Sequence, residues 1–336
     1  MAGQTGRHVS PLDFRLLNDF QRGLPLAERP YAALAEALGV DEAGVIDALA
    51  RLRAEGAVSR IGAVFRPGAL GASTLAAMAV PAERLPAVAA AVSAFPEVNH
   101  NYEREHRLNL WFVATASDEP ALAATLERIA LASGIAPIAL PLLEEYHIDL
   151  GFPLDGRRAP HSPRGSAQGR VALAPAERAL AAALAEGLPL EPRPFAALGA
   201  RVGLDEAGVI DRLAAWQADG LVRRFGVIVR HHELGWRANA MAVWDVPDHQ
   251  VARFGRRLAA ASGVTLAYRR ARCRPEWPYN LYCMVHGVER SEVAARVRAL
   301  DQTLGLAGLR HAVLFSRTRF KQTGARYAPP LETTHG

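Results

Sequence analysis

The sequence predicts an α+β protein that repeats one unit, a winged helix-turn-helix followed by a ferredoxin-like βαββαβ domain. The motif GVDEAGVID at residues 39–47 returns as GLDEAGVID at residues 203–211, an offset of 164 residues. The order of helical and strand patterns is also the same in both halves. Residues 155–169, rich in Gly, Pro, Arg and Ser, have the composition of a linker between the halves.

The first part of each half predicts short helices and a strand. In the first half the helices are expected over residues 12–20, 31–38 and 42–55, and the strand over residues 58–65. Gly39 is a natural C-cap for the second helix, and Asp41 is placed to N-cap the third. This arrangement is typical of a winged helix-turn-helix.

The rest of the first half predicts the order strand, helix, strand, strand, helix, strand. These elements are expected over residues 74–80, 82–94, 98–104, 109–115, 119–133 and 140–148. This is the ferredoxin-like order, and it recurs between residues 238 and 314. Asn109-Leu110 matches Asn280-Leu281 at the larger offset of 171, so the extra residues of the second half are placed at 273–278.

The patterns define the predicted domains along the chain. They are winged helix-turn-helix domains at residues 1–66 and 171–230, ferredoxin-like domains at residues 67–153 and 231–326, a linker at residues 154–170 and a tail at residues 327–336.

The composition is that of a soluble globular protein. Half of the residues are hydrophobic and 22% are charged. The length of 336 residues is enough for several domains with real cores. The net charge of +5 favours an anionic partner. Only Cys273 and Cys283 are present, which excludes a disulfide framework and a cysteine-based zinc site. Without an apolar run of membrane-spanning length or a signal-peptide core, we expect a cytoplasmic protein with no membrane partner.

The predicted recognition helices are unsuited to DNA. They begin with the acidic turns DEAGVID at residues 41–47 and 205–211, which lack Arg, Lys, Asn and Gln for bonding a base. Acidic side chains repel the phosphate backbone, which normally supplies most of the affinity. At a helix N-terminus they are instead ordinary stabilising residues. We expect structural helix-turn-helix domains and no DNA partner.

Two matched strands hold the central candidate residues. Side chains in a strand alternate between its faces, so His100, Tyr102 and Arg104 are predicted to share one face. The second strand, residues 264–270, repeats the tyrosine and the final arginine as Tyr268 and Arg270. Only the first strand carries a histidine.

The domain order resembles that of the Lrp/AsnC regulators, whose βαββαβ domains pair to bury ligands and dimer interfaces. A more specific similarity, covering nearly the whole chain, is to the siroheme decarboxylases, which act as enzymes on a modified haem precursor. It is carried by NHNYER at residues 99–104, LNLWF at 108–112, FGV at 225–227, VRH at 229–231, LGWRAN at 234–239, YRR at 268–270 and PYNL at 278–281. The chain resembles the fused form, in which A-type and B-type halves that occur elsewhere as separate subunits are joined.

The resemblance implies a carboxy-lyase. The implied reaction removes CO2 from the acetate side chains at C12 and C18 of siroheme and gives 12,18-didecarboxysiroheme, in the biosynthesis of haem d1 or an alternative haem. No cofactor of the protein's own is implied, because the iron belongs to the siroheme substrate.

Loss of CO2 from a pyrrole acetate requires an electron sink and a proton for the resulting carbon. Both needs favour a side chain that titrates near neutrality, and we take His100 and His231 as the catalytic candidates among eleven histidines. His231 follows Arg230 at the end of the second wing, where the first half has Pro67. We predict that both line one composite pocket between the ferredoxin-like domains, with His232 the weaker choice. Which one is the acid, and which orients the substrate or ligates its iron, stays open.

A substrate with eight carboxylates needs cationic anchors. Arginine suits this purpose because its planar guanidinium pairs bidentately with carboxylate and stays charged. The candidates for binding substrate are Arg104, Arg230, Arg237, Arg269 and Arg270, with Arg272 beside them, and the tyrosines Tyr102 and Tyr268. Trp111, Trp236 and Trp277 are placed either to stack on the macrocycle or, more ordinarily, to pack in a core.

Two alternatives stay open at this level: a DNA-binding regulator of the Lrp/AsnC kind, and a haem-binding sensor in which histidine ligates iron without chemistry.

One chain supplies an A/B pair and so forms a pseudo-dimer by itself. We further expect a homo-oligomer or association with related decarboxylase subunits, because Lrp-like sheet edges favour assembly.

Overall fold

The computed structural model describes residues 10–148, 151, 169–230 and 238–325. The chain divides into two compact units, and each unit takes residues from both halves. The winged-helix unit comprises residues 1–71, 151–234 and 326–336, and the sheet unit comprises residues 72–150 and 235–325. The tandem α+β architecture predicted from the repeat is confirmed.

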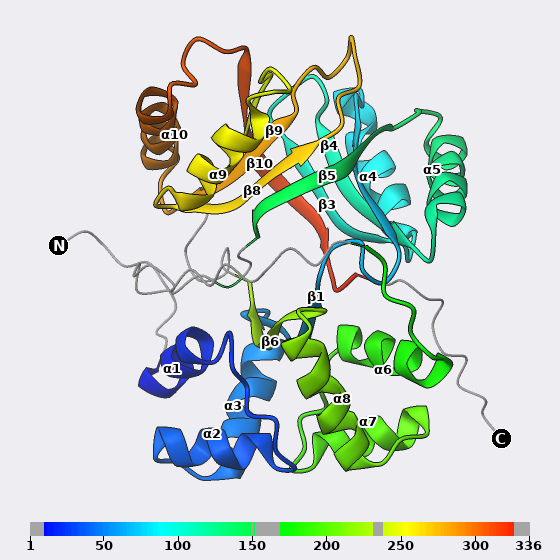
Figure 1. Cartoon of the computed structure of the whole chain (residues 1–336), viewed down its shortest axis with the longest axis vertical. Helices are drawn as coiled ribbons and strands as arrows, with labels where there is room; N and C mark the ends of the chain where they lie inside the picture. Colours follow the sequence, from blue (N-terminus) through cyan, green and yellow to red (C-terminus); the bar gives the residue numbers. More distant parts are fainter. Residues whose placement is uncertain (1–9, 149–150, 152–168, 231–237, 326–336) are drawn as a thin grey trace. The chain divides into compact units, whose positions relative to one another are not determined.

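The winged-helix unit holds two matched sets of three helices and one strand (Figure 1). The first set is α1 (Pro11–Asp19), α2 (Pro30–Leu38), α3 (Glu42–Ala54) and β1 (Val58–Phe65). The second set is α6 (Pro175–Glu186), α7 (Pro194–Val202), α8 (Glu206–Ala218) and β6 (Val222–Val229). Strands β1 and β6 pair antiparallel with Gly62 opposite Gly226, so the two wings bind each other.

Local sequence signals set the helix ends. Gly39 ends α2 with φ of 70°, in the left-handed region that glycine adopts without strain. Asp41 caps α3 by accepting a hydrogen bond from the Gly44 N–H at 2.7 Å, and Asp205 caps α8 in the same way. Glu42 and Glu206 form ion pairs with Arg29 and Arg193. The acidic turns are therefore structural helix starts, as predicted.

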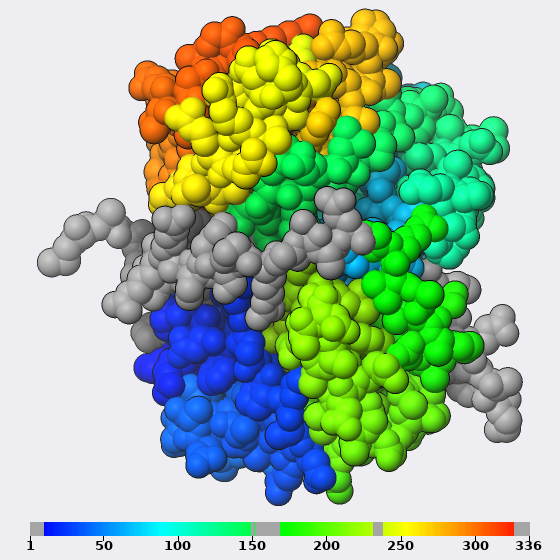
Figure 2. Space-filling model, viewed as in Figure 1, coloured from blue at the N-terminus to red at the C-terminus, as the bar shows by residue number. Residues whose placement is uncertain are grey.

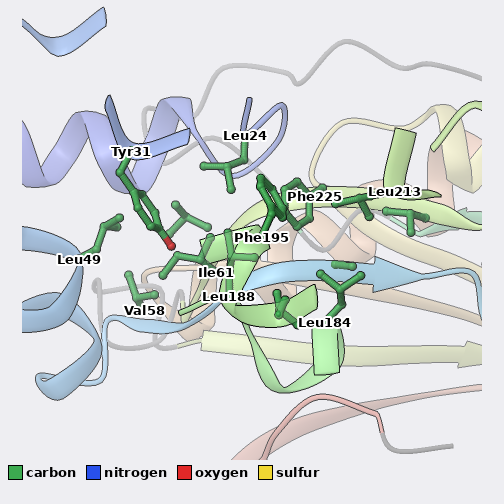
Figure 3. Close-up of a cluster of buried hydrophobic side chains, with 14 of the residues drawn as sticks. Leu24, Tyr31, Leu49, Val58, Ile61, Leu184, Leu188, Phe195, Leu213 and Phe225 are labelled. Atoms are coloured by element: carbon green, nitrogen blue, oxygen red, sulfur yellow. The ribbon is translucent and has the colours of Figure 1, made fainter. Parts of the chain in front are cut away.

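One hydrophobic core joins the two winged-helix halves. Figure 3 shows its side chains: Leu24, Tyr31, Leu49, Val58 and Ile61 from the first half, and Leu184, Leu188, Phe195, Leu213 and Phe225 from the second. In the space-filling view the blue and green halves of this unit are in direct contact (Figure 2). Burying apolar side chains from both halves together stabilises each half through the other.

The sheet unit repeats the βαββαβ order, as predicted. Its first half contains β2 (Ala72–Met78), the 3₁₀ turn η1 (Ala82–Arg84), α4 (Leu85–Ala94), β3 (Val98–Arg104), β4 (Leu110–Ala116), α5 (Glu119–Ser133) and β5 (Ile138–Ile148). Its second half contains β7 (Ala238–Trp244), α9 (Val251–Ala260), β8 (Val264–Arg270), β9 (Leu281–Gly287), α10 (Arg290–Leu304) and β10 (His311–Gln322).

Most predicted boundaries in the first half agree with the structure to within two residues, and two elements differ more. The helix expected over residues 82–94 is divided into η1 and α4, because Pro86 lacks an N–H group and is tolerated only in the first turn of a helix. Strand β10 continues past Leu314 to Gln322. The added length carries it from one neighbour to another: residues 311–315 pair with β7, and residues 316–322 pair with β3.

The described strands of the sheet unit close into one sheet, in the order β10-β3-β4-β2-β5-β8-β9-β7. Each half supplies the last strand that completes the other: β10 pairs with β3, and β5 pairs with β8 (Figure 1). Helices α4 and α5 cover the outer face of the first half, and α9 and α10 cover that of the second. A further apolar cluster, with residues from both halves including Leu75, Trp111 and Tyr282, lies on the other face, inside the closed sheet.

Within the described ranges, no helix combines the length and the apolar character that crossing a membrane requires.

Candidate active site

The predicted common face of β3 is present in the structure. The rings of His100 and Tyr102 are stacked, with centroids 6.3 Å apart and planes inclined by 20°. The Arg104 guanidinium carbon lies 5.8 Å from the centroid of the Tyr102 ring. The three side chains therefore form a row along one strand, with the aromatic ring between an imidazole and a guanidinium.

Arg104 is a buried cation, and the described residues give it no carboxylate partner. Its side chain donates a hydrogen bond to the Leu314 carbonyl at 3.2 Å and lies 4.0 Å from the Met284 sulfur. Among the residues that the structure describes, no carboxylate pairs with it. Burial lowers the pKa of Arg104, and the nearby Tyr268 and Tyr102 oppose that shift. Because burying an unpaired charge is costly, such a group is well placed for an anionic ligand.

Arg270 is the counterpart of Arg104 in the second half. Its side chain donates a hydrogen bond to the Leu140 carbonyl at 2.8 Å, and its guanidinium carbon lies 4.8 Å from the Tyr268 ring centroid. In the described part of the chain its Nε atom is buried without a hydrogen-bond partner. Each arginine thus stacks on the tyrosine two residues before it and bonds the last strand of the opposite half.

The His100 ring is oriented by its neighbour Asn99. The Asn99 amide donates to the Thr115 hydroxyl at 3.4 Å, which turns its carbonyl oxygen toward His100 Nδ1, 2.6 Å away. An imidazole in this arrangement donates its Nδ1 hydrogen to the amide oxygen. A register shift between Val98 and His100 in the pairing with β4 accompanies this contact between adjacent residues. The sequence prediction did not assign Asn99 a positioning role, although Asn99 is the first residue of the NHNYER motif at residues 99–104.

Two of the proposed stacking tryptophans are core residues. Trp277 packs edge-on against Trp111, with centroids 4.8 Å apart, and both are almost fully buried. Trp277 Nε1 donates to the Tyr282 hydroxyl at 2.6 Å, and the Tyr282 ring stacks on Tyr268 at 5.4 Å. This aromatic cluster fixes the Tyr268 ring against which Arg270 lies. Trp236 is outside the described residues.

Arg269 and Arg272 are not brought together with the row on β8. Arg269 follows Tyr268 directly and so projects from the opposite face of the strand. It pairs with Asp248 at 2.9 Å, and Arg272 pairs with both Asp245 and Asp248. Their charges are compensated by carboxylates, unlike those of Arg104 and Arg270.

The remaining predicted site residues follow the second wing. Arg230 belongs to the winged-helix unit, where its backbone N–H donates to the Ala57 carbonyl at 2.8 Å and its side chain to the Gly56 carbonyl at 3.5 Å. His231 and Arg237, like His232, lie outside the described residues. The predicted pairing of His100 with His231 therefore stays a prediction.

Two motif asparagines are structural clamps. The Asn109 side chain bonds both the N–H and the carbonyl of Val80, at 2.9 and 2.8 Å. Asn280 makes the same two bonds to Val246, at 2.9 and 3.0 Å. Asn109 thus joins the start of β4 to the segment after β2, and Asn280 joins the start of β9 to the segment after β7.

No metal site emerges from the described residues, where no three side chains among His, Cys, Asp and Glu gather into a group able to hold an ion.

Family models match both parts of each half. The model described as AsnC-like ligand binding domain matches residues 69–147 and 233–321. The model described as siroheme decarboxylase NirDL-like HTH domain matches residues 13–58 and 177–223.

Curated and solved relatives extend over nearly the whole chain. The siroheme decarboxylase NirDL subunit of Paracoccus denitrificans is 51% identical over 328 residues, covering 95% of this chain and 98% of the relative. A crystal structure of the siroheme decarboxylase NirDL matches with a TM-score of 0.67 at 26% identity, covering 95% of both chains. A second crystal structure, of that enzyme in complex with an iron-uroporphyrin III analogue, matches with a TM-score of 0.65 at 27% identity and covers 92% of both chains. On this evidence the chain belongs to the siroheme decarboxylase family.

Proposed function

We propose that this protein is a siroheme decarboxylase, a carboxy-lyase that removes CO2 from the acetate side chains at C12 and C18 of siroheme to give 12,18-didecarboxysiroheme. Family membership supports the reaction, and a related enzyme binds an iron-uroporphyrin III analogue. The observation that carries the proposal is the pair of interior arginines, Arg104 and Arg270, which have no carboxylate partner in the described chain and lie beside His100 and the tyrosines.

Substrate binding follows from that charge arrangement. The substrate brings eight carboxylates, and a buried guanidinium without a counter-ion gains more from binding one than a solvated guanidinium does. Arg104 and Arg270 are the anchors, and Tyr102 and Tyr268 are placed to donate hydrogen bonds to the same carboxylates. The apolar residues inside the closed sheet, such as Leu142 and Met284, suit the flat hydrocarbon surface of the macrocycle.

Each decarboxylation replaces a carboxyl group by hydrogen. The bond between the methylene carbon and the carboxylate breaks, CO2 leaves, and the electron pair is delocalised into the protonated ring system. One proton then adds to the methylene carbon and the ring releases the proton that it had taken up, so each acetate consumes one proton net and becomes a methyl group. His100 Nε2 is the proton donor in this scheme, because Nδ1 is held by Asn99.

The second histidine and the outer arginines complete the proposal. His231 serves the second acetate or orients the macrocycle, and Arg230 and Arg237 contribute further positive charge for the substrate carboxylates. The iron is part of the substrate, so the protein needs no cofactor of its own. One chain acts as a pseudo-dimer, and it associates with further copies or with related decarboxylase subunits.

The test is anaerobic incubation of the purified chain with siroheme, followed by mass spectrometry of the extracted tetrapyrrole. The expected result is loss of two CO2 units. Unchanged siroheme with a shifted absorption spectrum would instead indicate a haem sensor, and salt-sensitive binding to a specific DNA without turnover would indicate a regulator.

A further inference from the structure

The second half carries a histidine of its own on the inner face of the closed sheet. Strand β9 pairs with β7 without a register shift, and its residues Tyr282 and Met284 pack inside the closed sheet. His286 follows Met284 by two residues and therefore lies on the same inner face. It is half-buried, and its Nδ1 atom lies 3.0 Å from the Thr265 hydroxyl on β8.

A row of polar side chains connects His286 to the buried cation Arg104. Asn239 lies directly opposite His286 in the pairing of β7 with β9. Ser316 lies directly opposite Arg104 in the pairing of β10 with β3, and its hydroxyl donates to Asn239 Oδ1 at 2.6 Å. Directly opposed residues of an antiparallel pair present their side chains on the same face, so this row runs along the inside of the sheet.

A second contact brings Arg104 and His286 into the same neighbourhood. The Met284 sulfur lies 4.0 Å from an Arg104 guanidinium nitrogen. Residues two apart on one strand are separated by about 7 Å, which is the spacing of Met284 and His286. A ligand held by Arg104 therefore has His286 within reach of its next polar group.

The first half has the same local arrangement without the histidine. A register shift in β3 includes Asn99, and the matched shift in β8 includes Thr265. Asn99 donates to the Thr115 hydroxyl at 3.4 Å, and Thr115 matches His286 at the offset of 171 residues. Because a threonine fills this position in the first half, the fold does not require an imidazole in the second.

His286 and His100 lie toward the same end of the closed sheet. The β3–β4 and β8–β9 connections meet at the other end, where the rings of His106 and Trp277 are 5.3 Å apart. Strand β3 leads into the first of these connections after Arg104, four residues beyond His100, and β9 leaves the second at Leu281. Both inner-face histidines are therefore remote from the connections.

We propose that His286 is a further substrate-binding residue, which hydrogen-bonds a carboxylate of siroheme next to the one that Arg104 binds. This inference rests on the proposed function and adds a contact from β9 to the anchors Arg104 and Arg270. His100 remains the proton donor to the methylene carbon, so His286 contributes to affinity and His100 to the chemical step.

The Thr265 hydroxyl orients the His286 ring for this contact. It donates to the Met284 carbonyl at 3.3 Å, which leaves its oxygen to accept the Nδ1 hydrogen of His286. A nearby anion favours the protonated imidazole, in which both ring nitrogens donate. Nε2 then donates to the substrate carboxylate while Nδ1 donates to Thr265.

The experiment is an anaerobic absorption titration of the full chain with iron-uroporphyrin III and, in parallel, with metal-free uroporphyrin III. The variants are His286→Leu, His286→Gln, Thr265→Val and the control His311→Leu. His311 is exposed at the start of β10, with Nδ1 3.1 Å from the Leu309 carbonyl. The control thus removes an imidazole from the same sheet without changing its inner face.

H286L is expected to weaken binding of both ligands by about ten- to a hundredfold, because a charge-assisted hydrogen bond to a carboxylate is lost. T265V weakens it by about two- to tenfold, because the ring loses the hydroxyl that orients it. H286Q binds more tightly than H286L, since its amide N–H still donates to the ligand, and H311L stays near the wild type. At saturating siroheme the single-turnover rate of H286L stays near that of the wild type.

Three results would overturn the inference. Wild-type affinity of H286L for both ligands would remove the contact, and weakening confined to the iron-containing ligand would make His286 an iron ligand instead. Equal losses of affinity in H286L and H286Q, with lowered melting temperatures in both, would show a packing role. Siroheme turnover by the wild type is scored separately, so failure of the proposed function is recognised independently of the binding data.

Discussion

Strands β3 and β8 occupy equivalent positions in the two halves but carry different side chains at one key position. Both end in a tyrosine and an arginine two residues apart, and both arginines bond a carbonyl on the last strand of the opposite half, Leu314 for Arg104 and Leu140 for Arg270. They differ at the position two residues before the tyrosine, where β3 has His100 and β8 has Leu266. In the proposed function, the arginines held in common bind substrate carboxylates, and the divergent histidine places the chemistry at β3.

The sharpest way to break this comparison is to remove the one histidine. His100→Ala is expected to lower the rate of siroheme decarboxylation by about 10²- to 10⁴-fold, because the proton donor is lost. Leu266→Ala, the matched change on β8, is expected to keep the rate within about threefold of the wild type. Single-turnover assays by mass spectrometry measure both.

His231→Ala belongs in the same series and is expected to lose activity to a similar extent. Near-normal turnover in both histidine variants, with native circular dichroism, would remove histidine from the mechanism.

The second test addresses the two matched arginines. Arg104→Met and Arg270→Met are each expected to weaken siroheme binding by about ten- to a hundredfold, because a charge-assisted bond to a carboxylate is lost. Neither change is expected to lower the melting temperature of the free protein markedly, since an apolar side chain replaces a cation that has no carboxylate partner among the described residues. The relief of desolvation should be larger at buried Arg104 than at half-buried Arg270.

Binding is measured by absorption titration and stability by thermal melting. If both arginines were structural, melting temperatures would fall while affinity stayed constant, and that result would contradict the assignment.

A smaller effect, on the free energy of unfolding, tests whether the two asparagine clamps are equivalent. Asn109→Ala removes two hydrogen bonds to a backbone segment, and Asn280→Ala removes the matching two and a further one to the Asp248 carboxylate. Each change is expected to reduce the free energy of unfolding by about 1–3 kcal/mol. The loss in Asn280→Ala should equal or slightly exceed that in Asn109→Ala, and siroheme affinity should be unchanged. Urea denaturation measures the stability, and a large difference between the variants would show that the halves do not share this element.

The smallest expected effect is a pH dependence of the folding stability that arises from a histidine of the first half. Burial, reinforced by Arg107, lowers the pKa of His106, whose Nδ1 accepts a hydrogen bond from the Leu108 N–H. The unfolded chain therefore binds the proton more readily. Stability should fall as the pH drops below the unfolded value of about 6.5 and level off once the folded pKa is passed.

The second half has Arg272 two residues after its matched arginine, and this residue keeps its charge over the whole pH range. His106→Asn should therefore flatten the stability profile between pH 5 and pH 7, the range around that unfolded value of about 6.5. An unchanged slope in chemical denaturation over this range would assign the effect to another group.

Much of the fold was predictable because its signals are local. Gly39 and Asp41 mark helix ends through their own backbone and side-chain chemistry, and alternation along β3 placed His100, Tyr102 and Arg104 on one face. The same alternation already separates Arg269 from Tyr268 and Arg270, and the sequence prediction did not use it there.

What the sequence did not reveal depends on contacts between distant segments. The contact between Asn99 and His100 accompanies a register shift against β4, and no local pattern announces it. The extension of β10 to Gln322 is stabilised by β3, more than 200 residues earlier in the chain, so Arg319 had no visible connection to Tyr102. Local propensity carries no information about such pairings.

The exchange of final strands has a consequence for how the chain is made. Each ferredoxin-like half, taken alone, leaves β3 or β8 with an unpaired edge, which is a template for pairing with another chain. Two identical first halves would satisfy those edges but duplicate His100 and lose the residues of β10. Covalent fusion gives the correct second half a high effective concentration around the first. Fusion thus favours pairing between the two unlike halves of one chain over pairing between like halves of different chains.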